Sequence, residues 1–153
     1  MTACMMNEPR PLSVRVLVLA DEPRLREQLV CVVSRTLRAS GDIAAIECVH
    51  SSTELTNAHA RSPADLIVVA AEAMATGSDT FVEEVRLTPG GSDAEVLLLG
   101  SDSGSRRSAE LGARELPSPP EPHVLGLVIA RFAARLVERR ATTMGFALTA
   151  FGL

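Results

Sequence analysis

The side chains best suited to chemistry in this chain stand directly after short apolar segments. Asp21, Glu22 and Glu72 are acids, and Ser101 and Ser118 carry hydroxyl groups. Two adjacent acids by themselves hold Mg²⁺ only weakly, and serines that follow strands often form turns. If the apolar segments are parallel strands, these side chains meet at the edge of a sheet where α/β proteins bind ligands. The strand ends would carry Ala20-Asp21-Glu22, His50-Ser51, Ala70-Ala71-Glu72, Gly100-Ser101-Asp102 and Pro117-Ser118-Pro119.

Other groupings that could support catalysis are incomplete. His50, His59 and His123 fall in different predicted elements. Cys48 lies two residues before His50, but no second pair of ligands at zinc spacing accompanies it. No segment has the glycine–serine–glycine pattern of a hydrolase nucleophile elbow. We therefore expect no enzymatic activity, no metal centre and no cofactor.

Five apolar segments predict strands, and one of them organises the rest of the chain. Leu66 to Val69 is apolar without polar alternation, which is typical of a strand covered on both faces in a parallel sheet. That central strand ends in two alanines, at the place where such sheets usually carry their chemistry. The expected strands are 14–19, 43–49, 65–72, 95–99 and 114–116.

The segments between the strands have apolar residues at helical spacing. Pro23 suits the first turn of a helix, and Ser51 followed three residues later by Glu54 is the pattern of a capping box. The expected helices are 24–38, 51–61, 78–87, 105–111 and 122–140. Strands that alternate with helices through short connections predict an α/β fold, a (βα)₅ doubly wound parallel sheet of the flavodoxin-like kind with strand order 2-1-3-4-5.

The length of 153 residues suits one domain. We expect a flexible arm over 1–12, the domain over 13–140, and an apolar tail or the start of a further domain over 141–153. The opening residues lack the apolar core of a secretory signal, and arginines interrupt the apolar stretch after Val124, so neither a signal peptide nor a membrane span is expected. Three cysteines without paired spacing favour a cytoplasmic location.

Composition narrows the function further. The net charge of −4 and the 3% aromatic content disfavour nucleic acid as a partner, since such proteins need a basic face or stacking aromatic rings. All fifteen basic residues are arginine. The chain therefore has no lysine for a Schiff base or for contacting a phosphoryl group.

Four segments of the chain resemble the receiver domain of two-component response regulators. They are VRVLVLADEP, DLIVVAAEAM, EVLLLGSD and LGARELPSP, and the resemblance covers roughly 14–140. The resemblance implies that the strand ends correspond to an acidic pair, a phosphoacceptor aspartate, a Ser or Thr, and a lysine that precedes a cis-proline.

The resemblance places the acidic pair at Ala20 and Asp21 and the phosphoacceptor at Ala70. Ala70 has no nucleophile for aspartyl phosphorylation, and Asp21 with Glu22 could hold Mg²⁺ only weakly. Glu72 lies two residues beyond Ala70. Its carboxylate either enters the pocket as a permanent negative charge or stays in water.

The remaining positions of the site are also altered. The hydroxyl position falls on Gly100, with Ser101 one residue later, and the lysine position falls on Ser118, which is followed by Pro119. Ser101 and Ser118 are either remnants of the hydroxyl groups that contact the phosphate or residues that form turns. A chain that contains no lysine and no tyrosine can have neither the lysine nor a tyrosine switch of the family. We therefore predict a degenerate receiver that does not depend on phosphorylation.

Such a domain has its surfaces to work with. In the resembled family, the face made by the fourth helix, fifth strand and fifth helix mediates dimerisation and partner docking; here it is either an interface or a solvated face. The last helix also carries Val124, Leu127 and Val137 outside its core stripe, which is more apolar surface than burial on one side needs. The charged residues expected on this face are Arg106, Arg107, Glu110, Arg114, Glu115, Arg131 and Arg135.

The expected function is that of a pseudo-receiver signalling module that acts through protein–protein interaction, including a homodimer through that face. One alternative is an atypical receiver that senses a small ligand in the degenerate pocket. Another is the localisation domain of a pilus-assembly ATPase, because the segment LGARELPSPP is similar to the receiver-like N-terminal domain of those proteins.

Overall fold

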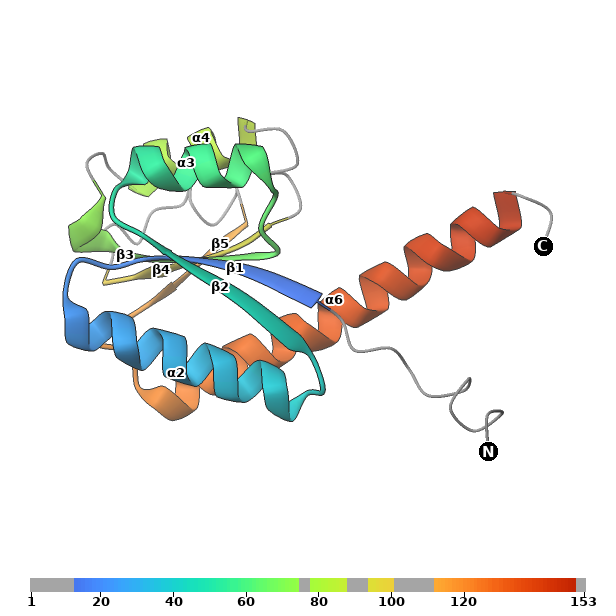
Figure 1. Cartoon of the computed structure of the whole chain (residues 1–153), viewed down its shortest axis with the longest axis horizontal. Coiled ribbons are helices and arrows are strands. Elements are labelled where there is room, and N and C mark those ends of the chain that lie inside the picture. The colour runs from blue at the N-terminus through green and yellow to red at the C-terminus, as the bar shows by residue number, and fades with distance from the viewer. Residues whose placement is uncertain (1–12, 75–77, 88–93, 101–111, 151–153) are drawn as a thin grey trace.

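The computed structural model describes residues 13–74, 78–87, 94–100 and 112–150, and for residues 78, 79 and 142–150 it describes the backbone alone. Strands and helices alternate along this part of the chain (Figure 1). The elements are β1 (Ser13–Leu19), α2 (Pro23–Ala39), β2 (Ile43–Val49), α3 (Ser52–Arg61), β3 (Leu66–Ala70), the 3₁₀ turn η1 (Ala71–Ala73), α4 (Ser78–Leu87), β4 (Glu95–Leu99), β5 (Ala113–Leu116) and α6 (Pro122–Ala150).

The five strands form one parallel sheet in the order β2-β1-β3-β4-β5, which confirms the predicted fold class and topology. All five residues of β3 are buried, as expected for a central strand whose two neighbours supply its hydrogen bonds. The strand order reverses between β1 and β3. The crevice that such a reversal opens lies at the carboxyl ends of these two strands.

Helices cover both faces of the sheet, so the core has two layers (Figure 1). Because successive strand residues point to opposite faces, Val16 and Val18 pack with α2 and α6, while Leu17 and Leu19 pack with α3 and α4. Phe132 of α6 and Phe81 of α4 are among the largest fully buried side chains. The core is otherwise aliphatic.

Local sequence signals set the starts of the helices. Ser51 accepts a hydrogen bond from the backbone N–H of Glu54 at 3.0 Å, and the Glu54 carboxylate accepts one from the N–H of His50 at 3.1 Å. This confirms the predicted capping interaction at the start of α3. At α6 the carboxylate of Glu121 accepts hydrogen bonds from the N–H groups of His123 and Val124, at 3.1 and 3.0 Å.

The last helix differs from the prediction. It continues to Ala150, whereas we expected it to end near Arg140. Figure 1 shows that its C-terminal part leaves the body of the domain. The sequence allows this continuation because residues 141–150 contain no proline, and the single glycine, Gly145, weakens a helix without ending it. The predicted helix over 105–111 lies outside the described residues.

Two arginines make contacts at the amino-terminal ends of β1 and β3. Asp65 accepts a hydrogen bond from the backbone N–H of Arg15 at 2.9 Å, and its other carboxylate oxygen pairs with Nη2 of Arg140 at 3.1 Å. Arg140 also donates to the carbonyl oxygen of Ser13 at 3.2 Å. These contacts anchor α6 to β1 and β3 just before the helix leaves the domain. Within the described residues, no helix is both long and apolar enough to cross a bilayer.

Candidate functional site

The central strand ends at a side chain that carries no chemistry. Ala70 is the last residue of β3, pairs with Leu99 of β4, and is fully buried. The chain then enters η1, where the side chain of Glu72 is exposed. Of the two orientations considered for Glu72, the structure shows the solvent-exposed one. Position 70 therefore carries no carboxylate, and the Glu72 side chain is exposed to solvent.

The loop after β1 keeps two acids but turns both to water. Ala20 is buried, and Asp21 and Glu22 are exposed. Glu22 is the N-cap residue of α2, but its side chain makes no capping hydrogen bond. The first of the two positions of the resembled acidic pair is thus part of the core. The remaining two carboxylates lie in the loop between β1 and α2 and face solvent.

An arginine of α2 that sequence reasoning overlooked contacts the same loop. Nε and Nη2 of Arg26 donate to the carbonyl oxygen of Ala20 at 3.1 and 2.9 Å, and Nη2 lies 3.5 Å from the carbonyl oxygen of Asp21. The guanidinium group thus places a permanent positive charge against the carboxyl end of β1. Its only sequence signal is its place in the first turns of an amphipathic helix, which does not separate it from a solvated arginine.

Gly100 and Ser118 come together just after the carboxyl ends of β4 and β5. Gly100 follows β4 with a φ of +75°, and its N–H donates to the carbonyl oxygen of Leu116 at 2.8 Å. A Cβ atom built on Gly100 would lie 2.8 Å from Cβ of Ser118. The hydroxyl and lysine positions of the resemblance are therefore neighbours, as expected, but no side chain fits at position 100. Ser101 lies outside the described residues.

The loop that carries Ser118 is tied to α2. The peptide bond between Ser118 and Pro119 is cis, as the resemblance implies for this position. Gln28 of α2 donates from Nε2 to the carbonyl oxygen of Pro120 at 3.1 Å. Burial patterns in a sequence do not reveal a polar side chain that bonds a loop 92 residues away.

Within the described residues, this edge keeps only part of the ligand set of the Mg²⁺ site that the resemblance implies. Hard divalent cations need several oxygen ligands, usually including more than one carboxylate. Asp21 and Glu22 are exposed, position 70 has no carboxylate, and the charge of Arg26 adjoins the same loop. In the part of the chain that the structure describes, no three His, Cys, Asp or Glu side chains are grouped so that they could hold a metal ion.

The predicted docking face is described only in part. Arg106, Arg107 and Glu110 lie outside the described residues. Arg114 and Arg135 both pair with Oε1 of Glu95, at 3.2 and 2.8 Å. These two arginines therefore join β5 and α6 to β4 within the molecule. Arg131 is exposed and Glu115 is half-buried.

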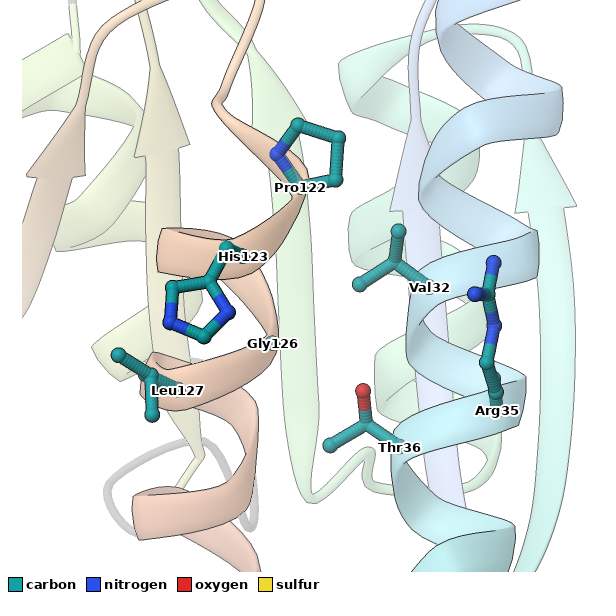
Figure 2. Close-up of a pocket in the computed structure, with 7 residues that line it drawn as sticks. All are labelled: Val32, Arg35, Thr36, Pro122, His123, Gly126 and Leu127. Atoms are coloured by element: carbon teal, nitrogen blue, oxygen red, sulfur yellow. The ribbon is translucent and has the colours of Figure 1, made fainter.

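Two hollows lie between α2 and α6. One, of about 310 Å³, is lined by Val32, Arg35 and Thr36 of α2 and by Pro122, His123, Gly126 and Leu127 of α6. Figure 2 shows Val32 and Thr36 extending from α2 toward α6, across from Gly126. The second, of about 360 Å³, is lined by Ser40, Asp42, Ala130, Ala133, Ala134, Val137 and Glu138.

One histidine is buried on the opposite face of the sheet. His59 of α3 is fully buried, and its Nδ1 accepts a hydrogen bond from the N–H of Ala64 at 2.9 Å. Among the described residues its Nε2 has no hydrogen-bond partner. Burial, with the charges of Arg15 and Arg86 as smaller contributions, lowers the pKa of His59 from its ordinary value of 6.5. A buried neutral imidazole with one local bond serves the packing of α3.

Comparison with known proteins identifies the architecture. No protein-family model and no curated protein matches the sequence. Solved structures do match. The chemotaxis response regulator CheY4 of Vibrio cholerae has a TM-score of 0.62 and 22% identity, over 78% of this chain and 98% of that one. The receiver domain of the sensor histidine kinase PA1611 from Pseudomonas aeruginosa, which has a magnesium ion coordinated in its active-site cleft, has a TM-score of 0.58 and 17% identity, over 78% of this chain and 97% of that one.

A third match has a higher structural similarity and a lower identity. The response regulatory domain of the protein mrkE from Klebsiella pneumoniae has a TM-score of 0.69 and 8% identity, over 82% of this chain and 99% of that one. The chain therefore has the fold of a response-regulator receiver domain. At these identities the similarity establishes the fold and not the activity.

Proposed function

We propose that the chain is a pseudo-receiver, a signalling module whose output depends on protein–protein interaction and not on aspartyl phosphorylation. The observation that carries this proposal is Ala70 at the end of β3, fully buried and without a nucleophile. A methyl group cannot accept a phosphoryl group. The surroundings agree, because Gly100 has no room for a hydroxyl-bearing side chain and the chain has no lysine.

The same features argue against a rescue by a neighbouring acid. Glu72 is exposed in η1, and Asp21 and Glu22 are exposed beside Arg26. An aspartate could replace the lost phosphoacceptor only with a divalent cation and a positively charged group aligned on the phosphoryl oxygens. The acids present suit such a cation poorly, and the guanidinium group of Arg26 is bonded to backbone carbonyl oxygens, so we infer that partner binding regulates the module. On this proposal the chain acts in two-component signalling, in the cytoplasm, with a protein as its partner.

Incubation with a small-molecule phosphodonor and Mg²⁺, followed by intact-mass spectrometry, tests the proposal. The expected result is no stable phosphoryl adduct, under conditions in which a receiver domain with an intact phosphoacceptor is labelled. The variant Ala70→Asp is the informative control. Because it restores the nucleophile without the lysine, we expect labelling that is slower than that of the intact receiver. A phosphoaspartate on the unaltered chain would refute the proposal.

Two narrower functions are distinguished by experiment. If the crevice senses a small molecule, one metabolite should raise the melting temperature in a saturable manner, and substitution of Asp21 or Arg26 should abolish that shift. If the chain is the localisation domain of a pilus-assembly ATPase, as the similarity of residues 111–120 suggests, the chain should bind a component of that machinery directly. The pseudo-receiver proposal predicts neither a metabolite shift nor a particular machinery.

A further inference from the structure

Helix α6 carries more exposed large apolar side chains than any other described element. Five large apolar side chains are exposed within the described residues, and three of them are on α6: Val124, Leu127 and Val137, at 42%, 49% and 47%. The buried stripe of the same helix, which includes Leu125, Ile129 and Phe132, already faces the sheet. Leu127 and Val137 therefore belong to a second apolar face, outside the buried stripe.

The second face has the spacing of a coiled-coil seam. Leu127, Ala130, Ala134, Val137 and Ala141 follow one another at intervals of three, four, three and four residues. This is the alternation of a and d positions in a heptad, with Leu127, Ala134 and Ala141 at a and the other two at d. In sequence, the same alternation continues at Met144 and Leu148. The seam thus runs from the domain onto the part of α6 that projects from it.

The surface beside this seam is hollowed. Leu127 lines the first hollow, and Ala130, Ala134 and Val137 line the second, so both hollows follow the groove between α2 and α6. Small residues form much of this lining, which allows another helix to approach closely. An apolar groove between two helices is a common receiver of a third amphipathic helix.

The projecting part of α6 also needs a partner. Residues 141–150 continue the helix beyond the domain in Figure 1. Ten residues of helix gain little from intrinsic propensity, because most helical stability in proteins comes from packing of an apolar face. Packing on another surface would supply that stabilisation.

We propose that α6 pairs with α6 of a second copy in an antiparallel arrangement, so that the projecting segment of each copy lies in the α2–α6 groove of the other. In the proposed register, Ala134 of one copy lies against Val137 of the other, and Ala130 lies against Ala141. The two-fold axis between the copies generates each of these two pairs a second time. In this arrangement the projecting segment of each copy fills the groove of the other and packs its own apolar side there. The proposal does not rely on the missing phosphoacceptor, and it concerns the α2 side of α6 and not the face of Arg114.

Charge complementarity selects the second copy and its direction. Arg131 and Glu138 are exposed and occupy successive e positions beside the seam. In an antiparallel pair, e positions face e positions, so in this register Arg131 of each copy lies opposite Glu138 of the other. In a parallel pair, e positions face g positions, and Arg131 and Glu138 would face Gly126 and Ala133, which carry no charge. Only the antiparallel pair uses both charges.

Sedimentation equilibrium of the full chain tests the pairing. The unaltered chain should be a dimer that dissociates on dilution. Val137→Asp places a charge in the seam, and we expect it to weaken self-association by about a hundredfold or more, because burying an unpaired carboxylate is costly. Leu87→Asp is the matched control, since Leu87 is 84% exposed on α4, away from the seam. Circular dichroism verifies that both variants fold.

Charge reversal tests the register. Arg131→Glu alone sets like charges opposite each other twice, and we expect dimerisation to weaken roughly tenfold at low salt. Glu138→Arg should do the same, and the double swap Arg131→Glu with Glu138→Arg should restore the affinity. A simple loss of one structural side chain would not be rescued by a second substitution.

A cysteine distinguishes the two directions. The test uses the Ala141→Cys variant in a background without native cysteines. In the antiparallel pair, the two introduced cysteines are separated along the helix axis by eleven residues, which is about 16 Å. That separation is too long for a disulfide, whereas a parallel pair would bring the two introduced thiols into contact. The expected result is no disulfide-linked dimer under mild oxidation. A monomer at all concentrations, a dimer insensitive to Val137→Asp, no rescue by the double swap, or a disulfide-linked dimer of the Ala141→Cys variant would each overturn the proposal.

Discussion

Substitution of Gly100 by alanine should measure how closely Gly100 and Ser118 are packed at the carboxyl ends of β4 and β5. Gly100 has a φ of +75°, and a Cβ there would lie 2.8 Å from Cβ of Ser118. The positive φ costs an L-residue about 1–2 kcal/mol, and overpacking adds about 1–3 kcal/mol. Replacing glycine by alanine also makes the unfolded chain less flexible, which offsets about 0.4–1 kcal/mol of this destabilisation. We therefore expect Gly100→Ala to lower the free energy of unfolding by about 2–4 kcal/mol.

Gly41 provides a matched control for the backbone contribution. Its φ is +81°, but a Cβ there would have no atom within 4 Å. Gly41→Ala should therefore lower the free energy of unfolding through backbone conformation alone, by a net amount of about 1 kcal/mol. The difference between the two alanine variants isolates the overlap with Ser118. Adding Ser118→Gly to Gly100→Ala should recover that difference and leave the backbone cost in place.

Urea denaturation followed by circular dichroism at constant pH measures all four variants. The expected order of stability loss is Gly100→Ala, then the double variant and Gly41→Ala together, then Ser118→Gly. If Gly100→Ala and Gly41→Ala lose the same free energy, no steric closure exists at position 100. Position 100 would then have room for a hydroxyl-bearing side chain.

Two further predictions concern groups away from the crevice. Burial keeps the pKa of His59 in the folded chain below 6.5, so the unfolded chain binds the proton more tightly. The contribution of neutral His59 to the free energy of unfolding is therefore complete above pH 6.5 and declines as the pH falls from 6.5 toward the lowered pKa. Stability profiles over that range should flatten in His59→Gln and keep their slope in His123→Gln, and an unchanged slope in His59→Gln would contradict this assignment. Glu95→Gln removes the charge that pairs with both Arg114 and Arg135 and should lower the free energy of unfolding, measured by urea denaturation, by about 1–2 kcal/mol. The loss is this small because both arginines are more than a third exposed and solvent screens the two pairs. Raising the salt concentration should narrow the gap between Glu95→Gln and the unaltered chain, and a gap independent of salt would show that packing and not charge accounts for the loss.

The amino-acid sequence by itself determined the architecture. The apolar segments 43–49 and 95–99 are strands at the predicted bounds, and the others agree within one or two residues at each end. This succeeded because strands buried on both faces have continuous apolar sequence, and because short alternating connections leave few topologies. The absence of lysine and tyrosine needed no structure at all.

Only the tertiary structure decided how the strand ends are used. It placed Glu72 in water, set Arg26 on the carbonyl oxygens of the first loop, and brought Gly100 against Ser118. It also carried α6 past Arg140, where the sequence had suggested an end. These features depend on side-chain direction and on contacts between residues far apart in the chain. Periodicity records which face of an element is apolar, but it does not record what lies opposite that face.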